Sequence, residues 1–192
     1  MSKELINVVL DLETLSTAPN AAIIQIGAVV PDFDYKNCLG NIVEFEATIQ
    51  YESCLELVNS IDPPVFMSHG TMEWWEKQPT RKEVFSGQLD YVDALDQFAA
   101  WIGHFERPVA IWGNGSDFDN VVLRHSLDAF GFHGLWEFRN NRCFRTLKAV
   151  FPLMTEATGR YSNELTHTAL GDARYEARML DLIVQAYGIK GI

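Results

Sequence analysis

The sequence predicts an α/β domain built on a mixed sheet, and three observations carry this prediction. Apolar β-branched runs and helical periods follow one another in the order β-β-β-α-β-α-(β)-α over 192 residues. The first two apolar runs are separated by about ten residues, too few for a crossover helix, so we expect antiparallel neighbours. A content of 47% hydrophobic and 21% charged residues is typical of a globular chain. We therefore expect one domain over residues 1–192, with the first strand near the centre of the sheet.

Three strands are expected first. Residues 6–13 (INVVLDLE) and 22–30 (AIIQIGAVV) are apolar and β-branched, as in buried strands. Residues 41–49 (NIVEFEATI) alternate partly between polar and apolar side chains, which predicts a third strand. In sequence, these three strands form a meander.

Helices and one further strand are expected in the rest of the chain. The helical segments are those whose apolar residues recur with the helical period, and the strand is the apolar run after Pro108. The segments are helices over 71–77, 90–105, 117–130 and 169–187, and a strand over 109–114 (VAIWGN).

Charge and cysteine content narrow the class of function. The chain has 15 Lys and Arg against 26 Asp and Glu, a formal charge of −11, which argues against capture of long duplex DNA on a broad basic face. Nucleic acid is not excluded, because carboxylates gathered around divalent cations can still bind phosphate. Cys38, Cys54 and Cys143 lack metal-ligand spacing, so we expect free thiols and no disulfide.

The hydrophobic pattern predicts a protein outside the membrane. No run of about 18 apolar residues could span a bilayer. The first residues, MSKELINVVLDLETL, carry acids where a secretory signal needs an apolar stretch. We therefore expect a soluble cytoplasmic protein.

Two carboxylates close the first strand. Asp11 and Glu13 are two residues apart, so their side chains share one face, about 6.7 Å apart along the chain. Bare carboxylates so placed repel each other, and a divalent cation with oxygen ligands would compensate. The alternative is that the strand simply ends here and both acids are solvated.

A second group of acids lies in IWGNGSDFD (111–119), where a strand leads into a glycine-rich turn and a helix. Asp119 is expected in the first helical turn, facing the carboxyl edge of the sheet, where ligands gather in α/β folds. The alternative is capping, with Ser116 as N-cap and Asp119 at the third position. Asp117 is a rival candidate, and spacing alone does not choose between the two acids.

The third feature is HTALGD (167–172), at the start of the last predicted helix. Asp172 is either a site residue or an acid that favours a helix N-terminus. His167 is either a surface residue or a general base, since an imidazole titrates near neutral pH.

Together, these segments bring one histidine and four acids to one edge of the sheet. Four carboxylates and a base suit two-metal phosphodiester hydrolysis, in which two cations clamp the attacking and leaving oxygens. Carboxylate ligands favour Mg²⁺ or Mn²⁺, whereas zinc would require more histidine or cysteine.

Three motifs carry a resemblance to a known family. DLETL (11–15), GNGSDFDNVVL (113–123) and HTALGD (167–172) resemble the three motifs of the DEDDh 3′-5′ exonucleases. Within that superfamily, NAAIIQIGAVV (20–30) and TMEWWEKQ (71–78) look like the Rv2179c-like bacterial and phage exonucleases. The resemblance covers residues 8 to 180 and so nearly the whole chain.

The resemblance implies a ribonuclease H-like fold with a two-metal site. Its four metal ligands would be Asp11, Glu13, Asp119 and Asp172, holding two Mg²⁺ or Mn²⁺ ions, with His167 activating the attacking water. In the family, the second-motif aspartate follows a phenylalanine, which favours Asp119 over Asp117. The expected activity is removal of nucleoside 5′-monophosphates from the 3′ ends of single-stranded DNA or RNA, by a homodimer.

Substrate contacts are also implied by the resemblance. Thr14 and Leu15 would support and wedge the terminal nucleotide, Phe118 would stack on a base and Asn114 would hydrogen-bond. Trp74 and Trp75 have two interpretations. In the first, one is a core residue and the other is partly exposed. In the second, one of them lines the groove for the 3′ end, and Trp74 is the candidate for that role. The arginines of FRNNRCFR, at 139, 142 and 145, form either a solvated face or a phosphate-steering cluster.

Two other functions remain open from the sequence. One is a nucleic-acid-binding domain on the same fold that no longer cuts. The other is a small-molecule phosphoester hydrolase that uses the same metals. The intact set of five site residues argues against the first, because a retired site has no reason to keep repelling carboxylates together.

Overall fold

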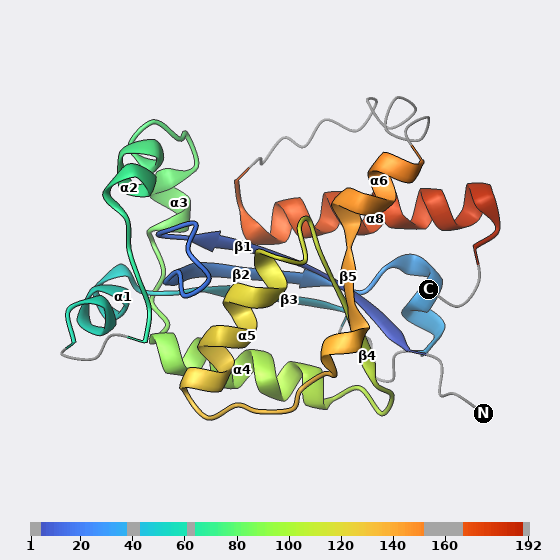
Figure 1. Cartoon of the computed structure of the whole chain (residues 1–192), viewed down its shortest axis with the longest axis horizontal. Helices are drawn as coiled ribbons and strands as arrows, with labels where there is room; N and C mark the ends of the chain where they lie inside the picture. Colours follow the sequence, from blue (N-terminus) through green and yellow to red (C-terminus); the bar gives the residue numbers. More distant parts are fainter. Residues whose placement is uncertain (1–4, 38–42, 61–63, 152–166, 190–192) are drawn as a thin grey trace.

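The computed structural model describes residues 5–37, 43–60, 64–151 and 167–189. Within them, five strands form one mixed sheet in the order β3-β2-β1-β4-β5 (Figure 1). The first three strands pair antiparallel, while β4 pairs parallel with β1 and with β5. The predicted mixed sheet, with its first strand at the centre, is therefore confirmed. The strands are β1 (Ile6–Thr14), β2 (Ile23–Val29), β3 (Glu44–Thr48), β4 (Val109–Gly113) and β5 (Asn141–Cys143).

Helices cover both faces of this sheet. α8 (Ala169–Tyr187) crosses one face over β1 and β2, whereas α4 (Tyr91–Gly103) and α5 (Asp119–Ala129) lie on the other (Figure 1). α6 (Phe144–Val150) follows β5, and its first residue packs in the same core cluster as α8. The smaller helices are α1 (Tyr51–Val58), α2 (His69–Trp75) and α3 (Arg81–Val84).

Short elements are where the sequence-based prediction is incomplete. It omits α1, α3, α6 and two 3₁₀ segments, η1 (Asp32–Asn37) and η2 (Phe138–Asn140). The three helices have eight residues or fewer, and none begins with a side-chain cap, so the usual start signal is missing. The predicted third strand covers 41–49, of which 41 and 42 lie outside the described residues; the observed strand is Glu44–Thr48.

Helix starts also shift where caps differ from the prediction. α2 begins two residues before 71, because the Ser68 hydroxyl accepts a hydrogen bond from the Thr71 N–H. α5 begins at Asp119 rather than at 117, and Phe118 occupies its N-cap position without a side-chain hydrogen bond. The suggested Ser116 cap is therefore wrong. The last predicted helix, 169–187, has the observed bounds.

Side chains of β1 alternate between two cores. The even-numbered residues from Val8 to Leu12 pack in a cluster that includes residues of α4 and α5. Val9 instead packs in a second cluster with residues of α8. Asp11 and Glu13 continue the odd-numbered series, so both carboxylates lie on the α8 face. The strand therefore presents its two acids to the start of α8.

Two glycines let the acid-bearing helices approach the sheet. Gly27 pairs with Asp11 across β1 and β2, and a Cβ on Gly27 would collide with the backbone of Ala169 in the first turn of α8. A Cβ on Gly113, at the end of β4, would collide with the Asn120 side chain in the first turn of α5. Because neither glycine has a side chain, both helix N-termini can lie directly beside β1.

The structure also bears on the membrane and cysteine expectations. Among the described residues, no helix combines the length and the apolar character that a membrane span requires. Cys54 is a buried free thiol and Cys143 a partly buried one. Cys38 lies outside the described residues.

Candidate active site

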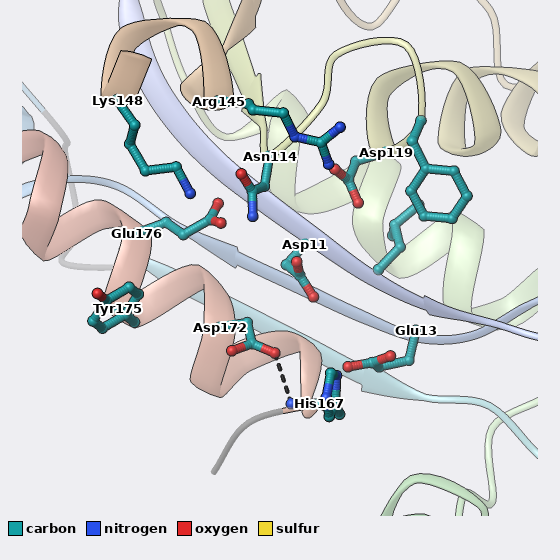
Figure 2. A pocket seen from close by; sticks show the side chains of 12 residues that line it. Asp11, Glu13, Asn114, Asp119, Arg145, Lys148, His167, Asp172, Tyr175 and Glu176 are labelled. Carbon is teal, nitrogen blue, oxygen red and sulfur yellow. Dashed lines mark hydrogen bonds between the residues drawn. The ribbon is translucent and has the colours of Figure 1, made fainter. Parts of the chain in front are cut away.

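A pocket of about 630 Å³ lies where β1 and β4 end and α5, α6 and α8 meet them (Figure 2). It contains all five residues expected to carry chemistry. Its lining consists of acids, two cations, one imidazole and a few flanking side chains: Asp11, Leu12, Glu13, Asn114, Phe118, Asp119, Arg145, Lys148, His167, Asp172, Tyr175 and Glu176.

The second-motif acids differ sharply in position. Asp119 is buried and lines the pocket, whereas Asp117 is exposed and does not. The turn between them is closed by a hydrogen bond from the Phe118 N–H to the Gly115 carbonyl, at 2.7 Å. This geometry turns the side chain at 119 toward β1 and leaves the side chain at 117 in solvent.

The start of α8 fixes the third motif. The Gln25 side chain on β2 accepts a hydrogen bond from the Ala169 N–H, at 2.8 Å, and so holds the first turn of α8 on the sheet. The backbone N–H of His167 donates to Oδ2 of Asp172, at 2.8 Å (Figure 2). His167 has φ of 65°, a left-handed conformation that is uncommon outside glycine. The turn thereby brings the imidazole and the Asp172 carboxylate to the same side of the pocket.

Burial and mutual repulsion hold protons on these acids. Burial, followed by repulsion from Asp172 and Asp119, raises the pKa of Glu13 to about 8. Burial raises the pKa of Asp119 to about 7, although backbone hydrogen bonds act to lower it. The pKa of Asp11 also lies well above its ordinary value, chiefly because of burial and then because of Asp119 and Glu13. Such a set is strained when ionised and would be relieved by positive charge.

One further acid was not found by sequence reasoning. Glu176 lies one helical turn after Asp172, so both side chains project from the same face of α8. It is 3% exposed, and burial raises its pKa to about 8 even though Lys148 lowers it. The i,i+4 spacing from Asp172 is the signal that could have revealed it.

Two cations from α6 also line the pocket, Arg145 near Asp119 and Lys148 near Glu176 (Figure 2). Arg145 and Lys148 are three residues apart on α6, so both reach the same pocket (Figure 2). Within the part of the chain that the structure describes, neither head group forms an ion pair, although Lys148 packs over the Phe144 ring at 4.7 Å. Arg145 belongs to the arginine cluster noted in the sequence, whereas Lys148 was not singled out.

The donor set suits a hard divalent cation. Glu13, His167 and Asp172 each place one ligand atom within 4.8 Å of the others. Among the described residues, two buried oxygens in the pocket lack a hydrogen-bond partner, Oδ1 of Asn114 and Oε2 of Glu176. Unpartnered buried acceptors beside several carboxylates fit Mg²⁺ or Mn²⁺, which take oxygen ligands.

Comparison with known protein families identifies the chain. A family model described as the 3′-5′ exoribonuclease Rv2179c-like domain matches residues 6–184. The chain belongs to the Rv2179c-like family. The resemblance seen in the three sequence motifs is thereby confirmed. No curated protein matches closely enough to be counted.

Solved structures share the fold of this Rv2179c-like chain at low sequence identity. A chain of the ExoI/SSB-Ct complex matches with a TM-score of 0.58 and 16% identity, covering 95% of this chain and 42% of that one. Cell-death related nuclease 4 (CRN-4) matches with a TM-score of 0.51 and 13% identity, covering 94% of this chain and 64% of that one. A chain of the complex of the yeast NOT1 MIF4G domain with CAF1 matches with a TM-score of 0.55 and 12% identity, covering 97% of this chain and 82% of that one. The expected ribonuclease H-like fold is confirmed.

The match in length differs among these structures. The Rv2179c-like chain spans less than half of the ExoI/SSB-Ct chain that it matches, at 42%, and 64% of CRN-4. At these identities the likeness shows the fold alone.

The residues expected to contact substrate divide into two groups. Asn114 and Phe118 line the pocket of the Rv2179c-like chain, beside Asp119. Thr14 and Leu15 do not: the Thr14 hydroxyl donates to the Ser16 carbonyl, and Leu15 is fully buried in the core. A nucleotide contact by either would use the backbone or require the side chain to move.

The tryptophan pair follows the division into a core residue and an exposed residue. Trp75 is 1% exposed and packs in the main core, whereas Trp74 is 39% exposed. Trp74 does not line the pocket itself, but its ring lies against that of His167, with centroids 4.9 Å apart.

Proposed function

We propose that this chain is a metal-dependent exonuclease that shortens single-stranded nucleic acid from its 3′ end and releases nucleoside 5′-monophosphates. The observation that carries the proposal is the meeting of Asp11, Glu13, Asp119, Asp172 and His167 in one pocket. Membership of a family described as 3′-5′ exoribonucleases supports the direction of attack.

The four aspartate and glutamate side chains of the three motifs are the proposed ligands of two Mg²⁺ or Mn²⁺ ions. When bound, such ions stabilise the charge that develops on phosphoryl oxygens and make a bound water more acidic. The raised pKa of Glu13 supports this role, because repulsion from Asp172 and Asp119 adds to burial in raising it, and carboxylates that repel one another favour a cation between them.

His167 is the proposed general base. Its imidazole accepts a proton from the water that attacks the last phosphodiester phosphorus. The bond from phosphorus to the 3′ oxygen of the preceding nucleotide breaks, and that oxygen leaves on the shortened strand and takes a proton from solvent. The released nucleotide keeps the 5′ phosphate. The hydrogen bond from the His167 backbone N–H to Asp172 holds the histidine at the edge of the acid cluster, where this proton transfer can occur.

Phosphate binding is assigned to the two cations that line the pocket. Arg145 and Lys148 are charged hydrogen-bond donors, and among the described residues neither forms an ion pair. They supply positive charge in the pocket of a chain whose formal charge is −11. Phe118 offers a ring for a base, and such stacking tolerates any sequence. These contacts suit a single strand, whose bases are free to stack.

The test uses matched single-stranded RNA and DNA oligonucleotides labelled at the 5′ end. With Mg²⁺ or Mn²⁺, we expect a ladder that shortens from the 3′ end and is abolished by EDTA and by Asp172→Ala. The family description favours RNA as the faster substrate, and a faster DNA ladder would assign the other polymer. If neither polymer shortens, the proposal is wrong. Oligonucleotide binding without cleavage would then favour a nucleic-acid-binding domain that no longer cuts. Release of inorganic phosphate from mononucleotides would favour a small-molecule phosphoester hydrolase.

A homodimer is part of the proposal. Its support is the resemblance to the DEDDh exonucleases and an aromatic content of 12%, which is high for a small domain. Light scattering should give twice the mass of one chain, which is 21.8 kDa. A mass of one chain would refute the dimer without affecting the proposed chemistry.

A cytoplasmic location is the last part of the proposal. The free thiols of Cys54 and Cys143 suit a reducing compartment. Cell fractionation should recover the protein with cytoplasmic markers, and recovery in the membrane or outside the cell would contradict this.

A further inference from the structure

The general base has a neighbour that neither the motifs nor the family match assigns to it. The ring of Trp74, on α2, meets the imidazole of His167 edge to face, with an interplanar angle of 87° and centroids 4.9 Å apart. This is a favourable geometry for an aromatic pair. The two residues are far apart in sequence, so the contact joins α2 to the turn that precedes α8.

Trp74 is itself held in place from behind. Its ring packs on Trp75 with centroids 4.8 Å apart and an interplanar angle of 73°. Trp75 is buried, and its indole N–H donates to the Thr14 carbonyl at 2.9 Å. Thr14 directly follows Glu13 at the end of β1. A continuous series of contacts therefore connects the strand that carries two acids to the imidazole.

The backbone contacts of His167 do not by themselves fix the orientation of its imidazole. His167 has a left-handed backbone, with φ of 65°, and its N–H is used by Asp172. The backbone bond fixes the main chain at this residue but leaves rotation about the side-chain bonds free. In the described residues, Trp74 is the aromatic ring that packs on His167, so it can restrict that rotation.

We propose that Trp74 is a positioning residue that orients the His167 imidazole for proton transfer, rather than a platform for the substrate. The proposal rests on the proposed function, since it assigns the role of a residue that acts on the general base. A misplaced general base slows the chemical step and leaves substrate affinity unchanged.

The two roles predict different kinetics for Trp74→Leu. A positioning role predicts a fall in kcat of about 10- to 100-fold with KM nearly unchanged. Trp74→Phe keeps an aromatic ring and should recover most of the rate. A substrate platform instead predicts a rise in KM and in the dissociation constant of an oligonucleotide measured with Ca²⁺ in place of Mg²⁺. The matched control is Tyr187→Leu, an exposed aromatic at the far end of α8, which should leave both constants unchanged.

A double-mutant cycle tests whether Trp74 acts through His167. In a His167→Ala background, replacing Trp74 should cause little further loss, because the ring no longer has an imidazole to orient. An equal loss in both backgrounds would overturn the proposal.

Proton NMR of histidine-labelled protein gives a second measurement that does not depend on activity. Three-bond couplings across the Cα–Cβ bond of His167, assigned by their absence in His167→Ala, should indicate one fixed rotamer in the wild type and in Trp74→Phe and rotamer averaging in Trp74→Leu. Unchanged couplings together with an unchanged kcat in Trp74→Leu would refute the positioning role. Full activity of His167→Ala would instead contradict the proposed general base, so the two failures can be told apart.

Discussion

The pocket has two sides that are built differently. The carboxylate side (Asp11, Glu13, Asp119 and Asp172) comes from β1, α5 and α8, which pack into the two cores. The cation side (Arg145 and Lys148) comes from α6, where Arg145 is exposed and Lys148 partly buried. Folding brings the acids together against their repulsion, whereas the cations remain at an edge that solvent reaches. Changes on the carboxylate side should therefore affect the reaction strongly, and changes on the cation side should adjust affinity.

The largest expected effect is on the carboxylate side. Asp119→Asn should lower kcat/KM about a thousandfold or more, because it removes one charged ligand from the acid cluster. Thermal stability should stay equal or rise, since repulsion with Glu13 decreases. The matched control is Asp117→Asn, which changes an exposed acid in the same turn and should leave turnover close to that of the wild type. Similar losses in both variants would show that the buried position of Asp119 has no special role.

The next effect tests what holds the carboxylate side together. Gly27→Ala should destabilise the fold by about 2–3 kcal/mol and lower turnover, since the added Cβ meets the backbone of Ala169 and pushes α8 from the sheet. Gly103→Ala, at the end of α4, meets no atom within 4 Å and is the control. Urea unfolding of both variants measures the difference. Equal stability for the two variants would contradict the close approach at Gly27.

A smaller effect is expected from pH in the absence of divalent cations. The folded chain raises the pKa of Glu13 from 4.5 to about 8, so between these values the folded state keeps a proton that the unfolded state has lost. This contribution to stability is complete below pH 4.5 and is lost as the pH rises through about 8. In chelator, the free energy of unfolding should therefore fall over this range, and Mg²⁺ should restore it at pH 8.

Glu176 contributes to the same pH dependence. Its pKa is also raised from 4.5 to about 8, so Glu176→Gln should flatten the pH dependence of unfolding in chelator. A pH dependence that is the same in wild type and in Glu176→Gln would mean that this buried acid is not part of the repelling set.

The smallest effect is expected on the cation side. Arg145→Gln and Lys148→Gln should each raise KM about threefold to tenfold, with kcat little changed, and reduce the dependence of KM on salt. Arg107→Gln, before the opposite end of β4, removes the same charge away from the pocket and is the control. Binding titrations at several salt concentrations measure the slopes. Identical slopes for all three variants would show that these cations do not contact phosphate.

Much of the carboxylate side could be predicted from the sequence. Asp11 and Glu13 share a face because strand side chains alternate, and this holds whatever surrounds them. The place of Asp119 and Asp172 beside them depends on Gly27 and Gly113, which the sequence shows only as glycines within strands.

The cation and aromatic contacts depend on tertiary packing and were harder to predict. Lys148 lies on a seven-residue helix that the sequence pattern did not reveal. Glu176, in contrast, lies on α8, whose bounds were predicted, and its i,i+4 spacing from Asp172 was a signal that the sequence did offer. The contact of Trp74 with His167 joins residues from separate elements, so no local pattern could indicate it.

The proposed chemistry requires the carboxylate side to bind divalent cations. Crystals grown with Mn²⁺ should show two anomalous peaks roughly 3.5 to 4 Å apart, in contact with Asp11, Glu13, Asp119 and Asp172. The same experiment on Asp119→Asn should lose at least one peak. Crystals of the wild type at saturating Mn²⁺ with no peak in this pocket would contradict this requirement.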